Sequence, residues 1–149
     1  MPNPTVDFYL LNTSIQDSLY RFTCRLIEKA YLQQKKIFIQ VNSHEEGQRI
    51  DELLWTFRDI SFIPHSYLGV NPFFDSYSSA VNIATDKPKR LEADILFNLS
   101  HTIPTYFPEF LRIIEVVSEE KKNKNQSRQK YKFYKAQNCQ LTTHNISAS

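Results

Sequence analysis

Few residues of this chain have the type and spacing that catalysis needs. Ser100 and His101 directly follow an apolar run at residues 94–99, and a serine beside a histidine at a strand end could supply a nucleophile and its base. The serine lies outside any G-x-S-x-G pattern, however, and no acidic partner for the histidine is indicated. Serine after a strand more commonly serves as a turn or cap residue. A small α/β hydrolase is therefore the weakest of the functions that we consider.

The remaining groups that could hold a metal ion or a cofactor are scattered along the chain. The four histidines show neither H-E-x-x-H nor another paired spacing of a zinc site, and Cys24 and Cys139 are isolated. With only two glycines, Gly47 and Gly69, the chain can form neither G-x-G-x-x-G nor G-x-x-x-x-G-K-[ST]. We therefore expect no catalytic residue, no metal and no cofactor.

The residues best suited to binding lie near the carboxyl end, in the stretch NKNQSRQKYKFYKAQN at residues 123–138. Residues 112–149 carry 8 basic against 3 acidic residues, whereas residues 1–111 carry 10 against 13. If residues 118–135 form a helix, five side chains gather on one stripe because they follow one another at steps of four, three, one and three. These five are Lys124, Arg128, Tyr131, Lys132 and Lys135, which we call the cationic stripe.

Three interpretations of the cationic stripe stay open at this point. An acidic peptide with a terminal carboxylate and an aromatic side chain would find positive charge along Lys124, Arg128 and Lys132, and an apolar wall at Tyr131. A single-stranded nucleic acid would find the same charges for its phosphates and tyrosine rings for its bases. A solvated run of charge without a ligand is the commoner case for such sequences.

A second group of candidates is aromatic. Trp55, the only tryptophan, lies where the second predicted helix ends, and Phe57 and Phe62 follow closely. These rings could complete the core, as aromatic residues usually do. They could also form an exposed patch that receives a helix or loop of a partner, because tryptophan is enriched at interface hot spots.

The elements that must position these residues alternate between strands and helices. β-branched and aromatic runs predict strands at residues 5–11, 36–41, 80–84, 94–99 and 112–117. Helices are predicted from residue 19 to about 34, from Ser43, where Glu46 completes the capping pattern S-x-x-E, and from Ser118 to about Lys135. Residues 104–111 predict a short helix, and residues 57–74 a long apolar connection broken by proline.

The alternation of apolar strands with helices indicates a mainly parallel sheet that is covered on both faces. The predicted fold is α/β, a three-layer α/β/α arrangement that is Rossmann-like but lacks the glycine loop for a nucleotide. We expect a single domain over residues 1–149, with a disordered polar tail from about residue 140. No apolar run approaches the roughly 18 residues of a spanning helix, so we expect a cytoplasmic protein without membrane contact.

Several stretches together resemble the chi subunit of bacterial DNA polymerase III. They are VDFYLL, RIDELLWTF followed by SFIPH, DILFNLS, and EVV followed by RQKYKFYK, and the resemblance runs from Val6 to about Tyr134. It implies a non-enzymatic accessory subunit of the clamp-loader assembly, with an α/β fold that has no working nucleotide site. Members of the family join the polymerase to single-stranded DNA-binding protein by gripping its acidic carboxyl-terminal tip, which ends in proline and phenylalanine, so contact with DNA is expected to be indirect.

The resemblance also assigns residues to partners. The family's closing motif places the grip on the tip at the cationic stripe, with Val117 lining the pocket for the terminal ring, although the family often has a longer connection after EVV. The motif DELLWTF followed by SFIP places the contact with the psi subunit of the clamp loader around Trp55 and Phe62. Some relatives use a similar surface for a repair helicase. Phe57 and Arg58 depart from the small or proline residues that other members often have, which leaves the partner of this face open.

Overall fold

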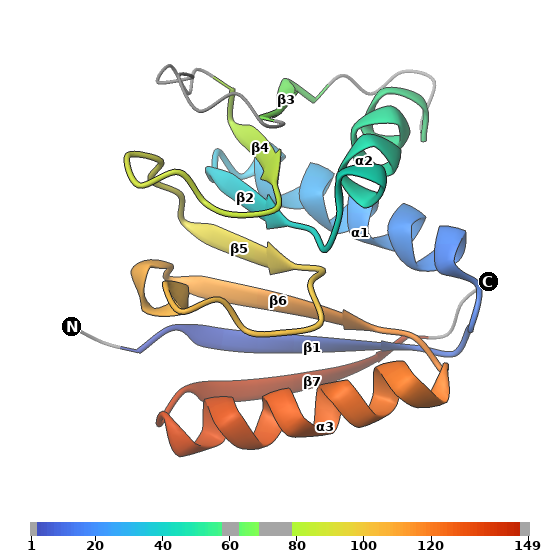
Figure 1. The fold of residues 1–149 in the computed structure, drawn as a ribbon, viewed down its shortest axis with the longest axis vertical. Coiled ribbons are helices and arrows are strands. Elements are labelled where there is room, and N and C mark those ends of the chain that lie inside the picture. The colour runs from blue at the N-terminus through green and yellow to red at the C-terminus, as the bar shows by residue number, and fades with distance from the viewer. Residues whose placement is uncertain (1–2, 58–62, 69–78, 147–149) are drawn as a thin grey trace.

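A single parallel sheet organises the chain. The computed structural model describes residues 3–57, 63–68 and 79–146, and in this part of the chain seven strands pair in the order β3-β4-β2-β5-β6-β1-β7, every pair parallel (Figure 1). The strands are β1 (Thr5–Leu11), β2 (Ile37–Gln40), β3 (His65–Tyr67), β4 (Val81–Ala84), β5 (Ile95–Asn98), β6 (Arg112–Val117) and β7 (Gln140–Ile146). The helices are α1 (Gln16–Leu32), α2 (His44–Thr56) and α3 (Lys121–Ala136), with a 3-10 turn η1 (Phe107–Glu109). The predicted α/β fold with a mainly parallel sheet is confirmed.

Helices cover both faces of the sheet. The buried apolar side chains of α1 and α2 share one core with Ile39, Phe97 and Ile114. On the other face, Tyr134 of α3 belongs to a second core with Phe8. This arrangement follows from the strands, whose alternate residues point to opposite faces and are apolar on both.

The amino end of α2 is fixed by the predicted capping residues. Ser43 Oγ accepts a hydrogen bond of 3.1 Å from the backbone N–H of Glu46. The Glu46 carboxylate in turn accepts from the backbone N–H of Asn42 at 2.8 Å and from the hydroxyl of Tyr20 on α1 at 2.6 Å. The capping pattern therefore also ties α2 to α1.

The helix that carries the cationic stripe begins later than predicted. We expected Ser118 to cap it, but α3 starts at Lys121 and its N-cap residue is Glu120. Ser118 is buried directly after β6, where its N–H donates to Asn123 Oδ1 at 2.8 Å. The N–H of Glu119 donates to the carbonyl of Thr13 at 2.8 Å, a contact outside the helix that delays its start.

The expectation of a disordered tail from about residue 140 was wrong for residues 140–146. These residues form β7, which pairs with β1 over its whole length. His144 Nε2 lies 2.9 Å from Asp7 Oδ1, and the His144 ring stacks on Tyr9 with centroids 4.4 Å apart. Cys139, placed in the tail by its polar neighbours, is buried. Pairing with the distant strand β1 makes this segment a strand, although its polar composition alone does not favour one.

Two smaller differences concern the connections. Within residues 57–74, His65–Tyr67 form the edge strand β3, while residues 58–62 and 69–74 lie outside the described residues. Of the helix expected at residues 104–111 only η1 forms, because Phe110 turns to an extended conformation and is buried in the core. No helix in the described part of the chain has the length and apolar character to cross a membrane.

Candidate functional site

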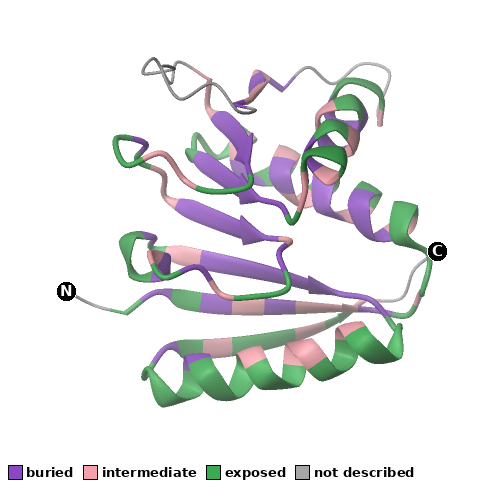
Figure 2. Ribbon diagram, viewed as in Figure 1, coloured by how far each residue is buried: buried purple, intermediate pink, exposed green. Residues whose placement is uncertain are grey.

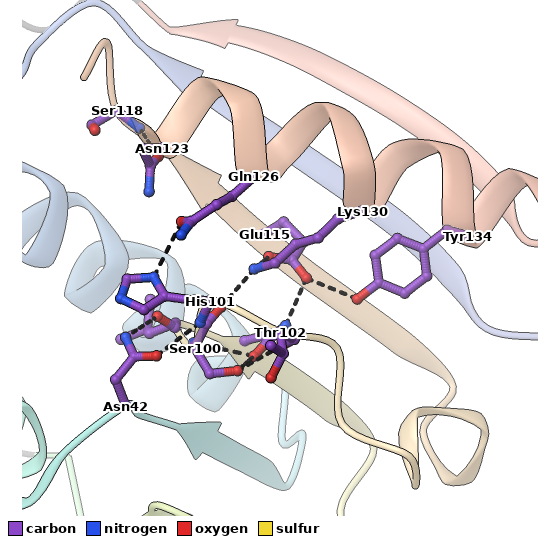
Figure 3. A network of polar contacts seen from close by, with 12 residues as sticks. Asn42, Ser100, His101, Thr102, Glu115, Ser118, Asn123, Gln126, Lys130 and Tyr134 are labelled. Carbon is purple, nitrogen blue, oxygen red and sulfur yellow. Dashed lines mark hydrogen bonds and ion pairs between the residues drawn. The ribbon is translucent and has the colours of Figure 1, made fainter. Parts of the chain in front are cut away.

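A buried carboxylate holds α3 against the sheet (Figure 3). Glu115, in the middle of β6, accepts a hydrogen bond from Lys130 Nζ at 2.9 Å and one from the Tyr134 hydroxyl at 2.7 Å, both on α3. Asn98 Nδ2 of β5 donates to the same carboxylate at 2.8 Å. Lys130 Nζ also donates to the carbonyl of Ser100 at 2.6 Å. Because the glutamate is buried, these donors satisfy a charge that would otherwise be costly.

The Tyr134 hydroxyl is a donor in this network rather than a proton-transfer group. Its burial, and next to it the negative charge of Glu115, raise the pKa of Tyr134 well above the ordinary value of 10.0. The phenol therefore stays protonated and keeps donating to the carboxylate throughout the neutral range.

The pair considered for hydrolysis, Ser100 and His101, is not arranged as a nucleophile and a base. Ser100 Oγ lies 2.5 Å from Asn98 Oδ1 and 2.7 Å from the carbonyl of Thr102, and it is buried. His101 instead contacts Gln126 of α3, with Nδ1 3.1 Å from the side-chain oxygen. Within the described residues no hydrogen bond joins the two side chains, so the geometry that a serine hydrolase needs is not formed here.

The same residues line a small polar cavity of about 170 Å³ at the carboxyl ends of β5 and β6. Its wall includes Asn42, Glu46 and His101. Most of these groups bond to one another: Asn42 Oδ1 accepts from the N–H of His101 at 2.8 Å, and Asn42 Nδ2 donates to Glu46 at 3.1 Å. The polar groups around the cavity therefore connect the amino-terminal end of α2 to the loop that follows β5 through hydrogen bonds.

The cationic stripe lies on the part of α3 that faces away from this network. All five of its residues are exposed, and Figure 2 shows α3 largely exposed along its length. Tyr131, 38% exposed, rests on the sheet with its ring centroid 5.5 Å from that of Phe8. The structure thus brings the predicted residues together on one ordered helix, with the tyrosine as the member that touches the core.

A hollow opens beside the amino-terminal end of the stripe. It measures about 290 Å³ and lies where β1 and β7 end. Its lining residues are Leu10, Leu11, Asn12, Glu119, Lys124, Asn145 and Ile146, which we call the terminal hollow. Val117, which we expected to line the pocket for the terminal ring, is buried and lines the polar cavity.

The aromatic candidates lie at the other end of the sheet. Trp55 is 51% exposed, and its ring lies 4.4 Å from the ring of His65, centroid to centroid. His65 is buried, with Nδ1 2.7 Å from the carbonyl of Ile63 and Nε2 3.2 Å from the Asp51 carboxylate. Trp55 is therefore not a core residue. One side of its ring packs against the ring of His65, which is fixed by its own polar contacts. Phe62 lies outside the described residues.

The comparisons with known proteins concern nearly the whole chain. A family model described as DNA polymerase III chi subunit, HolC, matches residues 3–142. The chain belongs to this family. Its similarity to the DNA polymerase III subunit chi of Pseudomonas aeruginosa is 30% identity over 141 residues, covering 95% of this chain and 96% of that protein. The corresponding values are 29% for chi of Haemophilus influenzae, with 95% and 97% covered, and 28% for chi of Escherichia coli, with 96% and 97% covered.

Membership of the chi family confirms the resemblance found in the sequence motifs and places the chain with DNA polymerase III in DNA replication. Two features of this chi-family chain escaped sequence analysis. The terminal hollow depends on Asn145 and Ile146 of β7, which no local pattern predicts. Glu115 did leave a signal, since a single acid inside the apolar run RIIEVV is unusual unless it has buried partners.

Proposed function

We propose that this chi-family chain is a non-catalytic adaptor of the DNA polymerase III clamp-loader assembly, which binds the acidic carboxyl-terminal tip of single-stranded DNA-binding protein on α3. The observation that supports this most is the exposed cationic stripe on an ordered helix with the terminal hollow at one end. A stripe of this kind attracts a negatively charged peptide, and a hollow lined partly by apolar side chains can select its last side chain.

The size and the lining of the terminal hollow suit an aromatic ring at a chain end. A cavity of about 150 Å³ is enough to hold benzene in an engineered protein, and this hollow measures about 290 Å³. Leu10 and Ile146 offer apolar contact, while Lys124 lies at the same hollow and can pair with a terminal carboxylate. A peptide that ends in phenylalanine carries both groups within one residue.

Each contact with a single tip is expected to be weak, because a peptide of a few residues buries little area and must be ordered when it binds. Several tips on one oligomer of the partner raise the effective concentration and so the avidity. Charge pairs on an exposed helix also weaken with added salt, which makes the attraction sensitive to ionic strength.

The second face of the proposed adaptor is the surface around Trp55. Its half-exposed ring, supported by His65, is a fixed apolar surface of the kind that anchors an interface. We assign this face to the psi subunit of the clamp loader or, as in some relatives, to a repair helicase. Phe62 is included in this assignment through its motif alone.

Fluorescence polarisation with three labelled ligands tests the proposal. The ligands are an acidic peptide ending in proline and phenylalanine, the same peptide without its last residue, and a single-stranded oligonucleotide. The proposal expects the full peptide to bind and the shortened one to lose most of its affinity. Tighter binding of the oligonucleotide than of the peptide would instead support direct recognition of single-stranded nucleic acid by the stripe.

A further inference from the structure

The outer edge of β7 is open for pairing. Among the described strands, β7 is the last in the sheet order and pairs with β1 on one side only. In a parallel ladder the backbone groups of alternate residues point to opposite sides. About half of the N–H and C=O groups of this seven-residue strand therefore face away from β1 without a neighbouring strand in the described part of the chain.

The side chains of β7 do nothing to block this edge. Its sequence, QLTTHNI, contains no lysine, arginine or proline, the residues that usually protect an exposed edge from pairing. Figure 2 shows much of β7 exposed, and its threonines favour an extended chain. At the opposite edge of the sheet, within the described residues, β3 has three residues, and protected edges are often short.

The helix that carries the cationic stripe runs beside β7. Figure 1 shows α3 alongside β7, and Lys124 of the stripe lines the terminal hollow together with Asn145 of β7. From Lys124 to Lys135 a helix rises by roughly 16 Å at about 1.5 Å per residue. An extended chain covers that distance with about five residues. A short acidic strand on the edge of β7 would thus meet positive charge along its whole length.

We propose that α3 and β7 together bind an acidic peptide as an eighth, parallel strand of the sheet. The inference rests on the proposed function, because the peptide in question is the acidic tip. The direction follows from the terminal hollow, which lies at the carboxyl end of β7. A peptide whose last side chain enters the hollow has its own carboxyl end there and therefore runs parallel to β7. Backbone hydrogen bonds then hold the peptide, and the stripe selects its charge.

A scan with N-methylated peptides tests this mode of binding. Each residue of the acidic peptide is N-methylated in turn, and the affinity for the full chain is measured by fluorescence polarisation. A strand loses about fivefold or more at every second position, where an N–H donates to β7, and little at the positions between. Equal effects at all positions, or none at any, would overturn the inference. Failure of the unmodified peptide to bind would instead overturn the proposed function.

Amide hydrogen exchange followed by NMR supplies a readout on the protein itself. Saturation with the unmodified peptide should slow exchange at alternate residues of β7, those whose N–H groups face outward. The Lys124→Ala variant should need more peptide for the same protection but show it at the same residues. If saturating peptide changes the NMR signals of α3 but slows the exchange of no β7 amide, the peptide is not a strand of the sheet.

Discussion

Glu115 on β6 and Tyr134 on α3 share a hydrogen bond of 2.7 Å with both side chains buried. Lys130, one helical turn before the tyrosine, reaches the other oxygen of the same carboxylate at 2.9 Å. Two points on one side of α3 are thereby tied to one point on the sheet, which fixes the rotation of the helix. The direction in which the cationic stripe faces is a consequence of this buried network.

Removal of the carboxylate should cost much of the stability. Glu115→Ala is expected to lower the free energy of unfolding by about 3 kcal/mol or more, because the largely buried Lys130 loses its charge partner. Urea denaturation measures the change. The control is Glu52→Ala, because the Glu52 side chain is 68% exposed and its partner Arg49, 3.6 Å away, is 35% exposed; the expected effect is below about 1 kcal/mol. Equal losses in the two variants would contradict the role assigned to Glu115.

The stability of the protein should fall at alkaline pH partly through Tyr134. Its pKa is raised in the folded state, so above pH 10 the unfolded chain loses this proton while the folded chain keeps it. The contribution is therefore fully present below the ordinary tyrosine pKa of 10.0 and is lost as the pH rises beyond it. Denaturation between pH 9 and about pH 11 should show a shallower decline for Tyr134→Phe than for the wild type. A residual decline is expected in the variant because the pKa values of Tyr20 and Tyr106 are also raised. An equal decline of stability with pH in the variant and the wild type would contradict the prediction.

Arg128 should contribute to peptide affinity without supporting the fold. Arg128→Ala is expected to weaken binding of the acidic peptide by roughly 1–3 kcal/mol, the range for the loss of a charge-assisted contact. Isothermal titration calorimetry measures the affinity, and thermal denaturation checks that the fold is intact. Arg25→Ala removes the same charge from an exposed position on α1, across the sheet, and should leave the affinity unchanged. An unchanged affinity for the Arg128 variant would exclude the stripe as the site.

Glu119 should oppose binding of the peptide. Glu119 lines the terminal hollow together with Lys124, which brings a negative charge near the expected position of the terminal carboxylate of the peptide. Glu119→Gln is therefore expected to tighten peptide binding by about 0.5–1 kcal/mol, with the larger effect at low salt. Titrations at two salt concentrations measure this change. Glu92→Gln makes the same charge change in a segment remote from the hollow and should leave the affinity unchanged. Weaker binding by the Glu119 variant would mean that the terminal carboxylate of the peptide does not lie at this hollow.

Trp55 should matter for the second partner alone. Trp55→Ala is expected to abolish co-purification with psi, because a supported aromatic anchor is lost, while binding of the acidic peptide stays at the wild-type level. Pull-down from a co-expression with psi measures the first effect. Leu111→Ala truncates another exposed apolar side chain, 67% exposed, and should keep the complex. Survival of the complex in the Trp55 variant would mean that the second face lies elsewhere.

Local sequence patterns predicted most of the elements and the membership of the stripe. The strands at residues 5–11 and 112–117 have the predicted bounds, because runs of β-branched and aromatic residues depend on near neighbours only. The bonds of Ser43 and Glu46 formed for the same reason. The spacing of the stripe residues from Lys124 to Lys135 also predicted correctly that they lie on one helix, since helical geometry relates residues that are close in sequence.

The sequence was thus enough to predict most of the elements, the family and the cationic stripe, because all three depend on patterns of residues that are close together in the sequence. Three further features arise from tertiary contacts: residues 140–146 form an edge strand, Val117 lines the polar cavity, and a hollow lies at the end of the stripe. The strand and the hollow depend on Leu10 lying beside Asn145, a pairing across most of the chain. The physical reason is that β pairing and burial are set by non-local contacts, whose free energy no short window of residues contains.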